Sequence, residues 1–181
     1  MKSMKMLLAI AALATISQSA FAGQSVKISI ILDAQNVYTQ ISDTAFAGNT
    51  STGHLELSVS GVINGTPVSQ SQNQDLGTNS FGGAGLTLLP NSQVKFTGTN
   101  GSSITVPASF EQNGNFVVQA SDVESAIKVL VKAQLADFSN KIATMGAKGK
   151  VVLKGKKMNC EKGEQRYTCS QGFSLFASMS K

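Results

Sequence analysis

Apolar and polar residues alternate along several segments of this chain. In residues 25–32 most apolar side chains fall at even positions, and in residues 54–63 they fall at odd positions. A period of two is typical of a strand with one buried face. Together with shorter segments of the same kind, the pattern predicts about nine strands, at residues 25–32, 36–42, 54–63, 86–89, 93–98, 103–110, 115–119, 149–159 and 165–177.

Turn residues separate these segments. Asn-Gly pairs at residues 100–101 and 113–114 favour tight hairpins, because both residue types accept a positive φ at little cost. Residues 69–85 are dominated by Gln, Asn, Ser and Gly, and only Leu76 and Phe81 offer an apolar anchor. We expect a long loop there that separates two groups of strands.

The period changes after residue 120. Ser121 and Glu124 have the spacing of a capping box, in which each side chain satisfies a free backbone N–H at a helix start. Apolar residues then recur at helical spacing and fall within an arc of about 80° on a wheel of 3.6 residues per turn. They are Ile127, Val131, Leu135, Phe138, Ile142 and Met145. The pattern predicts one amphipathic helix at about residues 122–145.

The order of these elements predicts an α+β fold. No regular alternation of strand and helix is present, so we expect a mainly antiparallel sheet, curled or barrel-like, with the long helix packed on one apolar face. Residues 23–181 have the size of a single domain. The last two strands, at about residues 149–177, form a terminal hairpin.

Residues 1–22 have the pattern of a secretory signal peptide. Lys2 and Lys5 precede an apolar run, and Ala20-Phe21-Ala22 supplies the small-x-small pattern that a signal peptidase cleaves. The run is too short to span a bilayer, which needs roughly 20 apolar residues. We expect a chain that is exported to the periplasm or beyond and does not span the membrane.

Charge is distributed unevenly along the chain. Residues 23–140 contain four lysines and eight acidic residues, a net of 4 − 8 = −4. Residues 141–181 contain eight lysines and one arginine against two glutamates, a net of 9 − 2 = +7. Segregation of this kind usually concerns partners or solubility.

The two cysteines lie within the basic segment. Cys160 and Cys169 form an even pair in a chain expected to be exported, so a disulfide is the default. A two-residue turn at Lys162 and Gly163 would place Cys160 opposite Gln165. A disulfide therefore requires a longer loop or a bulge.

Alternation also sorts the basic residues of the terminal hairpin. Lysines at alternate positions share one face of the strand that precedes the cysteines, and an arginine follows the hairpin turn. These candidate binding residues are Lys148, Lys150, Lys154, Lys156 and Arg166. A row of lysines protects an edge strand from aggregation, or it binds an anionic partner. Few aromatic residues accompany them, which disfavours nucleic acid.

Residue types needed for most chemistries are scarce. His54 is the only histidine, which excludes a metal site of several histidines within one chain. Ser125 and Lys128 match the S-x-x-K pattern of penicillin-interacting serine enzymes, but no K-T-G element follows. We therefore expect no catalytic residues, no metal, no cofactor and no enzymatic activity.

Three functions remain open at this point. The first is an envelope protein that binds an anionic surface, polysaccharide or protein through the lysine-rich hairpin. The second is a carrier of an apolar or lipid ligand held between sheet and helix, by residues such as Ile127, Val131, Leu135 and Phe138. The third is a subunit of an extracellular fibre or coat that assembles through exposed strand edges and the Gln/Asn-rich segment.

Overall fold

The computed structural model describes residues 25–63, 65–79, 84–144 and 148–180. The predicted signal peptide, residues 1–22, lies outside them. The described residues form eleven strands in one sheet and two helices. The elements are β1 (Ser25–Gln40), β2 (Ala45–Ile63), β3 (Thr66–Asn79), β4 (Gly85–Leu89), β5 (Gln93–Thr97), β6 (Ser103–Pro107), β7 (Ser109–Phe110), β8 (Phe116–Val118), α2 (Ala120–Leu130), α3 (Lys132–Thr144), β9 (Lys148–Gly155), β10 (Met158–Lys162) and β11 (Arg166–Ser180).

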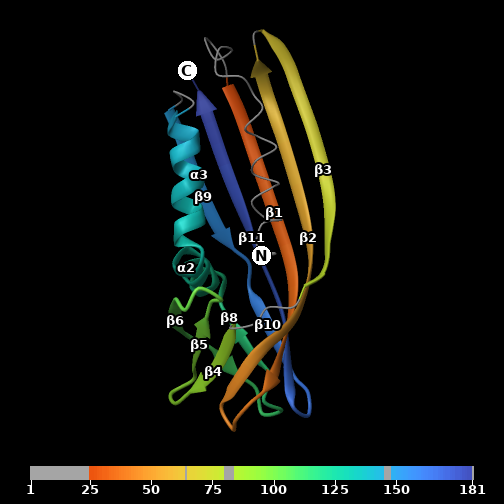
Figure 1. Cartoon of the computed structure of the whole chain (residues 1–181), viewed down its shortest axis with the longest axis vertical. Helices are drawn as coiled ribbons and strands as arrows, with labels where there is room; N and C mark the ends of the chain where they lie inside the picture. Colours follow the sequence, from red (N-terminus) through yellow and green to blue (C-terminus); the bar gives the residue numbers. More distant parts are fainter. Residues whose placement is uncertain (1–24, 64, 80–83, 145–147, 181) are drawn as a thin grey trace.

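Three long strands, β1, β2 and β11, run through the whole molecule (Figure 1). Towards one end they are flanked by β3 and β9, in the order β3-β2-β1-β11-β9, and we call this region the sheet half. Towards the other end the order is β6-β5-β4-β2-β1-β11-β10-β8-β7, and we call this region the barrel-like half. Each pairing is antiparallel, as the sequence predicts.

The barrel-like half is nearly closed. Its path of strands begins at β6 and ends at β7, and Ala108 alone lies between these two strands in the sequence. Ala108 is buried, and its N–H donates a hydrogen bond of 2.8 Å to the carbonyl oxygen of Ser92. The chain thus returns from one end of the path to the other within three residues, which confirms the prediction of a curled, barrel-like sheet.

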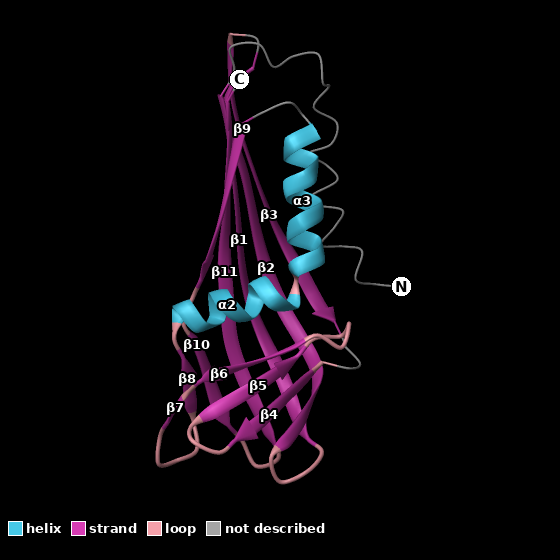
Figure 2. Cartoon of the chain, turned by 90° about the vertical axis from the view of Figure 1, so that its left-hand side faces the viewer, coloured by secondary structure: helices cyan, strands magenta, loops and turns pink. Residues whose placement is uncertain are grey.

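Two apolar clusters form the core. The barrel-like half encloses the first, in which Leu86, Val94 and Phe116 are completely buried. Helix α2 lies across the upper end of this half and adds Val123 and Ala126 (Figure 2). This arrangement buries Val123 and Ala126, whereas Val129 of the same helix is 40% exposed.

The second cluster covers one face of the sheet half. It contains the residues that alternate along β1 and their neighbours on β2, β9 and β11, and α3 lies along the same side (Figure 2). Ile127 packs against both clusters, and Leu135 of α3 packs against the second. The opposite face of the sheet half is mostly polar but also carries Ile31, Val152 and Phe176, and we call it the outer face.

The disulfide between Cys160 and Cys169 is present, as predicted. The two residues are direct partners in the register of β10 and β11, with Cα atoms 4.1 Å apart. The pairing continues to Lys162 opposite Tyr167, and the N–H of Gly163 donates to the carbonyl oxygen of Arg166 at 2.8 Å. Only Glu164 and Gln165 lie between Gly163 and Arg166, so a short turn two residues beyond the predicted one brings the cysteines opposite each other. The expectation of a longer loop or a bulge is wrong.

The predicted single helix is divided in two. Val131, with φ −115° and ψ 25°, separates α2 from α3, and the two helices run in different directions (Figure 2). Val123 and Ala126 of α2 belong to the first apolar cluster, and Leu135 of α3 packs against the second. The bend directs each helix to its cluster. The predicted capping box is wrong, because the N-cap is Gln119 and it makes no side-chain hydrogen bond. Glu124 instead accepts a hydrogen bond of 2.6 Å from Lys128.

The largest error of the sequence prediction concerns residues 69–85. Most of this segment belongs to β3, which pairs with β2 from Thr66 to Asn79. Its serines and glutamines carry no apolar periodicity, but a strand at the edge of a sheet needs only backbone hydrogen bonds to one neighbour. The predicted turn at residues 33–36 is also wrong, because β1 continues through it as one strand of 16 residues.

Candidate functional site: a polar hollow on the outer face

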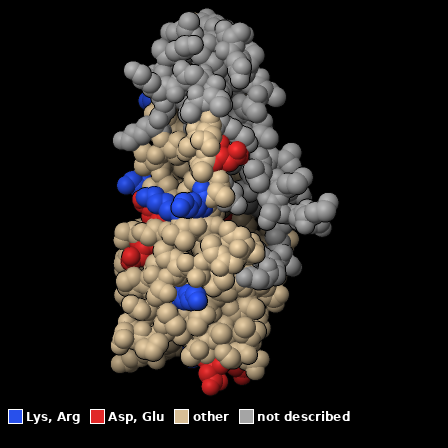
Figure 3. Space-filling view, turned by 60° about the vertical axis from the view of Figure 1, so that its left-hand side comes forward, with Lys and Arg blue, Asp and Glu red and all other residues tan. Residues whose placement is uncertain are grey.

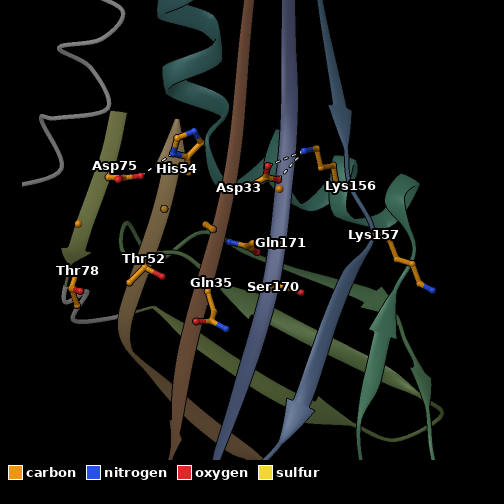
Figure 4. A pocket seen from close by; sticks show the side chains of 14 residues that line it. Asp33, Gln35, Thr52, His54, Asp75, Thr78, Lys156, Lys157, Ser170 and Gln171 are labelled. Carbon is orange, nitrogen blue, oxygen red and sulfur yellow. Dashed lines mark hydrogen bonds and ion pairs between the residues drawn. The ribbon is translucent and has the colours of Figure 1, made fainter. Parts of the chain in front are cut away.

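A hollow of about 650 Å³ lies on the outer face, in the middle of the long strands. It is formed where β1, β2 and β11 pass from the sheet half to the barrel-like half, beside the end of β3 (Figure 4). Its position follows from the alternation of the strands. Leu32 lies opposite Leu55 and Phe173 on the apolar face, so the next residues along these strands face outward.

The upper row of the hollow carries alternating charges. Across β3, β2 and β1 it contains Asp75, His54 and Asp33, and Lys156 follows the end of β9. The Nδ1 atom of His54 lies 2.8 Å from Oδ1 of Asp75, and Nε2 lies 3.9 Å from Oε1 of Glu56. The ammonium of Lys156 donates to Oδ1 of Asp33 at 2.8 Å and to Oδ2 at 3.1 Å.

Gly172 makes the contact between Lys156 and Asp33 possible. It lies on β11 directly opposite Asp33, and its carbonyl oxygen accepts a hydrogen bond of 2.8 Å from the N–H of Lys156. A Cβ atom on Gly172 would lie 2.5 Å from Oδ1 of Asp33 and 3.1 Å from Cδ of Lys156. The absent side chain therefore leaves the space through which Lys156 reaches across β11.

The lower row of the hollow is polar and uncharged. The register places Gln35 opposite Thr52 on one side and Ser170 on the other, and Thr52 lies opposite Thr78 (Figure 4). Amide and hydroxyl groups both donate and accept hydrogen bonds. Lys157 contributes to the wall beside Lys156. The hollow thus combines a row of hydrogen-bonding groups with Lys156 at one end, where Lys157 borders it with its side chain directed away from the row (Figure 4).

The charge of His54 depends on its neighbours. Its hydrogen bond with Asp75 raises the pKa of the imidazole above its usual value, and the carboxylates of Asp75, Glu56 and Asp33 act in the same direction. His54 is therefore protonated over a wider pH range than an isolated histidine. At mildly acidic pH the hollow gains a positive charge at the end opposite Lys156.

The pair of His54 and Asp75 can be compared with the histidine and carboxylate of a hydrolytic triad. A histidine with a carboxylate partner resembles two members of a hydrolytic triad, but it needs a hydroxyl within hydrogen-bond reach. The hydroxyl on the same strand and face, that of Thr52, is two residues away, which is about 7 Å along a strand. Among the described residues, no group of three or more His, Cys, Asp or Glu side chains is placed to hold a metal ion.

The structure divides the basic residues that the sequence groups together. Lys156 lies in the hollow, and Lys154 is exposed next to it on β9. Lys148 and Lys150 lie opposite Ser180 and Ser178 in the register, and their side chains are outside the described part. Arg166 lies opposite Thr39, near the far end of β11. Eight residues of β11 separate it from Ser174, the partner of Lys154, or about 27 Å.

The basic surface extends beyond β9. Figure 3 shows Lys and Arg side chains in a band across the middle of one face, with acidic side chains beside them. Lys128 of α2 pairs with Glu124 at 2.6 Å, and this hydrogen bond lowers the pKa of Glu124, with a weaker contribution from Lys154. This part of the band therefore contains an ion pair, whereas Lys157 forms none within the described residues.

Sequence reasoning missed most of the hollow. It named Lys156, but not Lys157, Gln35, Thr52 or Thr78. These residues come from four segments of the chain, and only the register between strands places them together. The hydrophobic pattern does predict which residues of a strand face outward. It does not predict which strands are neighbours.

Two of the residues expected to hold an apolar ligand contact the core clusters. Ile127 and Leu135 pack against the two apolar clusters, and Val131 is half-buried where the helix bends. The side chain of Phe138 lies outside the described part. A second hollow, of about 310 Å³, also lies on the outer face, beside Phe176 and Ser29. Neither hollow is lined by a residue of α2 or α3.

Comparison with known proteins gives no relative. No family model matches the chain, and neither the curated proteins nor the solved structures contain a match. Within the described residues, neither helix is long and apolar enough to cross a membrane.

Proposed function

We propose that this chain is an exported, non-enzymatic protein of the cell envelope that binds an acidic polysaccharide in the outer hollow. The observation that carries the proposal is the combination of Lys156 and Lys157 with a row of amide and hydroxyl side chains in one open depression. A sugar chain with carboxylate or sulfate groups presents the complementary chemistry. Its hydroxyls pair with the uncharged row, and its anionic groups pair with the lysines.

The ion pair of Lys156 with Asp33 is compatible with this role. An ammonium group has three N–H donors, and Asp33 takes two of them in the structure. The third remains for a ligand, while the carboxylate holds the lysine at the edge of the hollow. Lys157 is exposed and supplies a second cation with no carboxylate partner among the described residues.

The open shape of the hollow also favours a chain over a small molecule. Small-molecule sites usually enclose most of the ligand surface. This hollow instead follows the strands across the sheet, and its floor contains small residues such as Ala34, Gly53 and Gly172. A polymer can lie across such a surface and continue beyond it at both ends.

Binding to dextran sulfate, with neutral dextran as the uncharged reference, tests this proposal. The double variant Lys156→Gln/Lys157→Gln removes the two cations of the hollow and is expected to weaken binding roughly tenfold, about 1.4 kcal/mol. The control Lys95→Gln/Arg166→Gln removes the same charge from two exposed residues outside the hollow. It is expected to bind with nearly the affinity of the parent chain.

Equal losses in the two double variants would show that net charge alone drives binding, and would contradict the proposed site. A further variant, Gln35→Ala/Thr52→Ala, leaves the charge unchanged and removes the hydrogen-bonding row. It is expected to weaken binding at high salt, where charge contributions are screened. Unchanged binding of this variant at high salt would limit the site to the lysines.

A further inference from the structure

In the described part of the chain, the two edges of the sheet half differ in strand length, in lysine content and in the presence of a covering helix. At one edge, β9 is eight residues long and carries lysines at positions 148, 150 and 154. Helix α2 lies so close to the end of β9 that a Cβ atom on Gly155 would clash with the backbone of Ala120 and Glu124. Lysines and a covering helix are common protections of a sheet edge.

The other edge has none of these protections over most of its length. β3 is 14 residues long and pairs with β2, and in the described part of the chain no strand pairs with its other side. It forms the outer rim of the sheet in Figure 1. Its sequence, TPVSQSQNQDLGTN, has no lysine or arginine, and Asp75 is its single charged residue. From Val68 to Asp75 it contains neither proline nor glycine.

Such an edge offers unpaired N–H and C=O groups to an added strand. Eight residues, from Val68 to Asp75, present about 27 Å of ladder at 3.4 Å per residue. Strand addition of this kind takes its affinity from main-chain hydrogen bonds. The ladder ends naturally beyond Asp75, because the pairing shifts there and Gly77 has φ +65°.

We infer that β3 is the interface with a second copy of this chain, in which two β3 strands pair antiparallel about a two-fold axis. Antiparallel pairing of one strand with itself is isologous, and such interfaces are the commonest in homo-oligomers. The two sheet halves would then form one continuous sheet. This inference is independent of polysaccharide binding.

The alternation of residues in β3 fits pairing with itself. Residues 69–74 read Ser-Gln-Ser-Gln-Asn-Gln, with the glutamines on the side of Leu55, Leu57 and Val59. Any register that keeps the apolar faces of both copies on the same side places Gln opposite Gln, and Ser or Asn opposite Ser or Asn. Ladders of such amides add side-chain hydrogen bonds to those of the backbone.

Charge also favours β3 as its own partner. With the axis at Gln72, Asp75 lies opposite Ser69, so no like charges meet across the interface. Two β9 strands would instead bring their lysines together, and like charges directly opposite one another are destabilising. The edge with lysines thus resists self-pairing, whereas the edge without them permits it.

Sedimentation of the exported chain, with variants that place lysine on the free edge, tests this inference. The parent chain is expected to form a dimer at micromolar concentrations. The variant Gln70→Lys/Gln72→Lys is expected to raise the dissociation constant roughly tenfold or more. With the axis at Gln72, the two substituted positions 72 lie directly opposite each other, and each substituted position 70 is their neighbour on the same face. Both positions are exposed, so the fold is retained. The control Gln93→Lys/Gln112→Lys makes the same change at two exposed positions outside β3 and is expected to stay dimeric.

Spin labels along β3 test the two-fold geometry. Two antiparallel copies separate identical labels by a distance that is smallest at the axis and grows by about 6.8 Å for each residue away from it. We expect this minimum near position 72. A parent chain that remains monomeric at 100-fold higher concentration than about 1 μM would overturn the inference. So would a lysine variant that dimerises like the parent, or label distances without a minimum along β3.

Discussion

The barrel-like half and the sheet half share β1, β2 and β11, but they protect their apolar residues in different ways. In the barrel-like half the sheet curls around its core, α2 closes one end, and the Cys160–Cys169 disulfide joins two neighbouring strands. In the sheet half one face is apolar and the other carries the polar hollow. The difference teaches that a continuous strand can be part of a closed core at one end and part of a binding surface at the other.

The aromatic residues sharpen this contrast. Phe46 and Phe116 both contact Tyr167, with ring centroids 5.0 and 5.2 Å apart, and the hydroxyl of Tyr167 donates to the carbonyl oxygen of Gly114 at 2.9 Å. All three rings belong to the barrel-like half. The sheet half buries the ring of Phe173 and exposes that of Phe176 on its outer face, while Phe110 is exposed in the barrel-like half. We therefore expect stability to be concentrated in the barrel-like half.

The largest effect is expected from Phe116→Ala. Phe116 is completely buried among strands that cannot move together to fill the space, so the free energy of unfolding should fall by about 3–5 kcal/mol. The matched change in the sheet half, Leu175→Ala, should cost about 2–3 kcal/mol, because that cluster borders fewer enclosing strands. Urea denaturation of both variants measures the difference. A larger loss from Leu175→Ala would reverse the comparison.

Removal of the disulfide is expected to have the next largest effect. Closing a loop of ten residues stabilises the folded chain by about 2.5–3 kcal/mol on the chain-entropy model. The double variant Cys160→Ala/Cys169→Ala should lower the free energy of unfolding by that amount. Hydrogen exchange should speed up in β10 and β8 before it does in β9. Uniform loss of protection would mean that the two halves unfold as one unit.

Gly172→Ala affects the border between the halves. The new Cβ would lie 2.5 Å from Oδ1 of Asp33 and 2.7 Å from the carbonyl oxygen of Leu32, so β11 must shift. We expect a loss of about 1–3 kcal/mol, as in other overpacked sites. Asp33→Ala in the same background separates the two causes. Recovery of stability in the double variant would assign the loss to the carboxylate, and persistence would assign it to the backbone.

Asn36→Leu is expected to stabilise the protein. Asn36 is 3% exposed, and within the described residues its amide nitrogen has no hydrogen-bond partner. It lies opposite Cys169, on the inner side of β1. An apolar side chain of similar size removes the desolvation cost, which is about 1–3 kcal/mol for an unsatisfied polar group. A lower melting temperature for this variant would show that the amide is satisfied in solution.

The smallest effect is expected from His54, at the hollow itself. Because folding raises its pKa, this group contributes stability that is fully present below the unfolded pKa of about 6.5 and is lost as pH rises through the folded pKa. NMR titration of His54 should give a pKa above that of a model peptide, and Asp75→Asn should lower it. The stability difference between the parent and His54→Gln should shrink as the pH rises from about 5 to 8. A constant difference would contradict the ion pair.

Part of this molecule could be predicted from sequence. Alternation located the inward residues of β1 correctly, because Val26, Ile28 and Ile30 are buried. The cysteine spacing predicted the disulfide, but the turn was expected two residues too early, and with it a longer loop or a bulge that the structure does not have. β3 was missed because alternating Ser and Gln carry no apolar signal. The bend at Val131 was missed because apolar spacing continues through it, while the direction of each helix depends on the cluster that it covers.

The candidate site could be predicted only to the extent of its lysines. Alternation placed Lys156 on a polar face, and it had grouped Arg166 with it, although the fold separates the two. The hollow depends on which strands are neighbours, and on the missing side chain of Gly172. Both are properties of pairing between segments more than 100 residues apart in the chain, such as β1 and β11. Neither the strand neighbours nor the role of Gly172 can be predicted from a short segment of the sequence.

The pairing of Ser25 with Ser180 has a mechanical consequence. β1 and β11 are antiparallel over nearly their whole lengths, so a load applied between these two residues pulls on one hydrogen-bonded pair at a time. The strands would peel apart like a zip at low force, beginning in the sheet half. The peeling would stop where β10 and β11 are cross-linked by the disulfide. The same adjacency would let a short linker join residues 25 and 180, so that new ends could be opened at an exposed turn elsewhere.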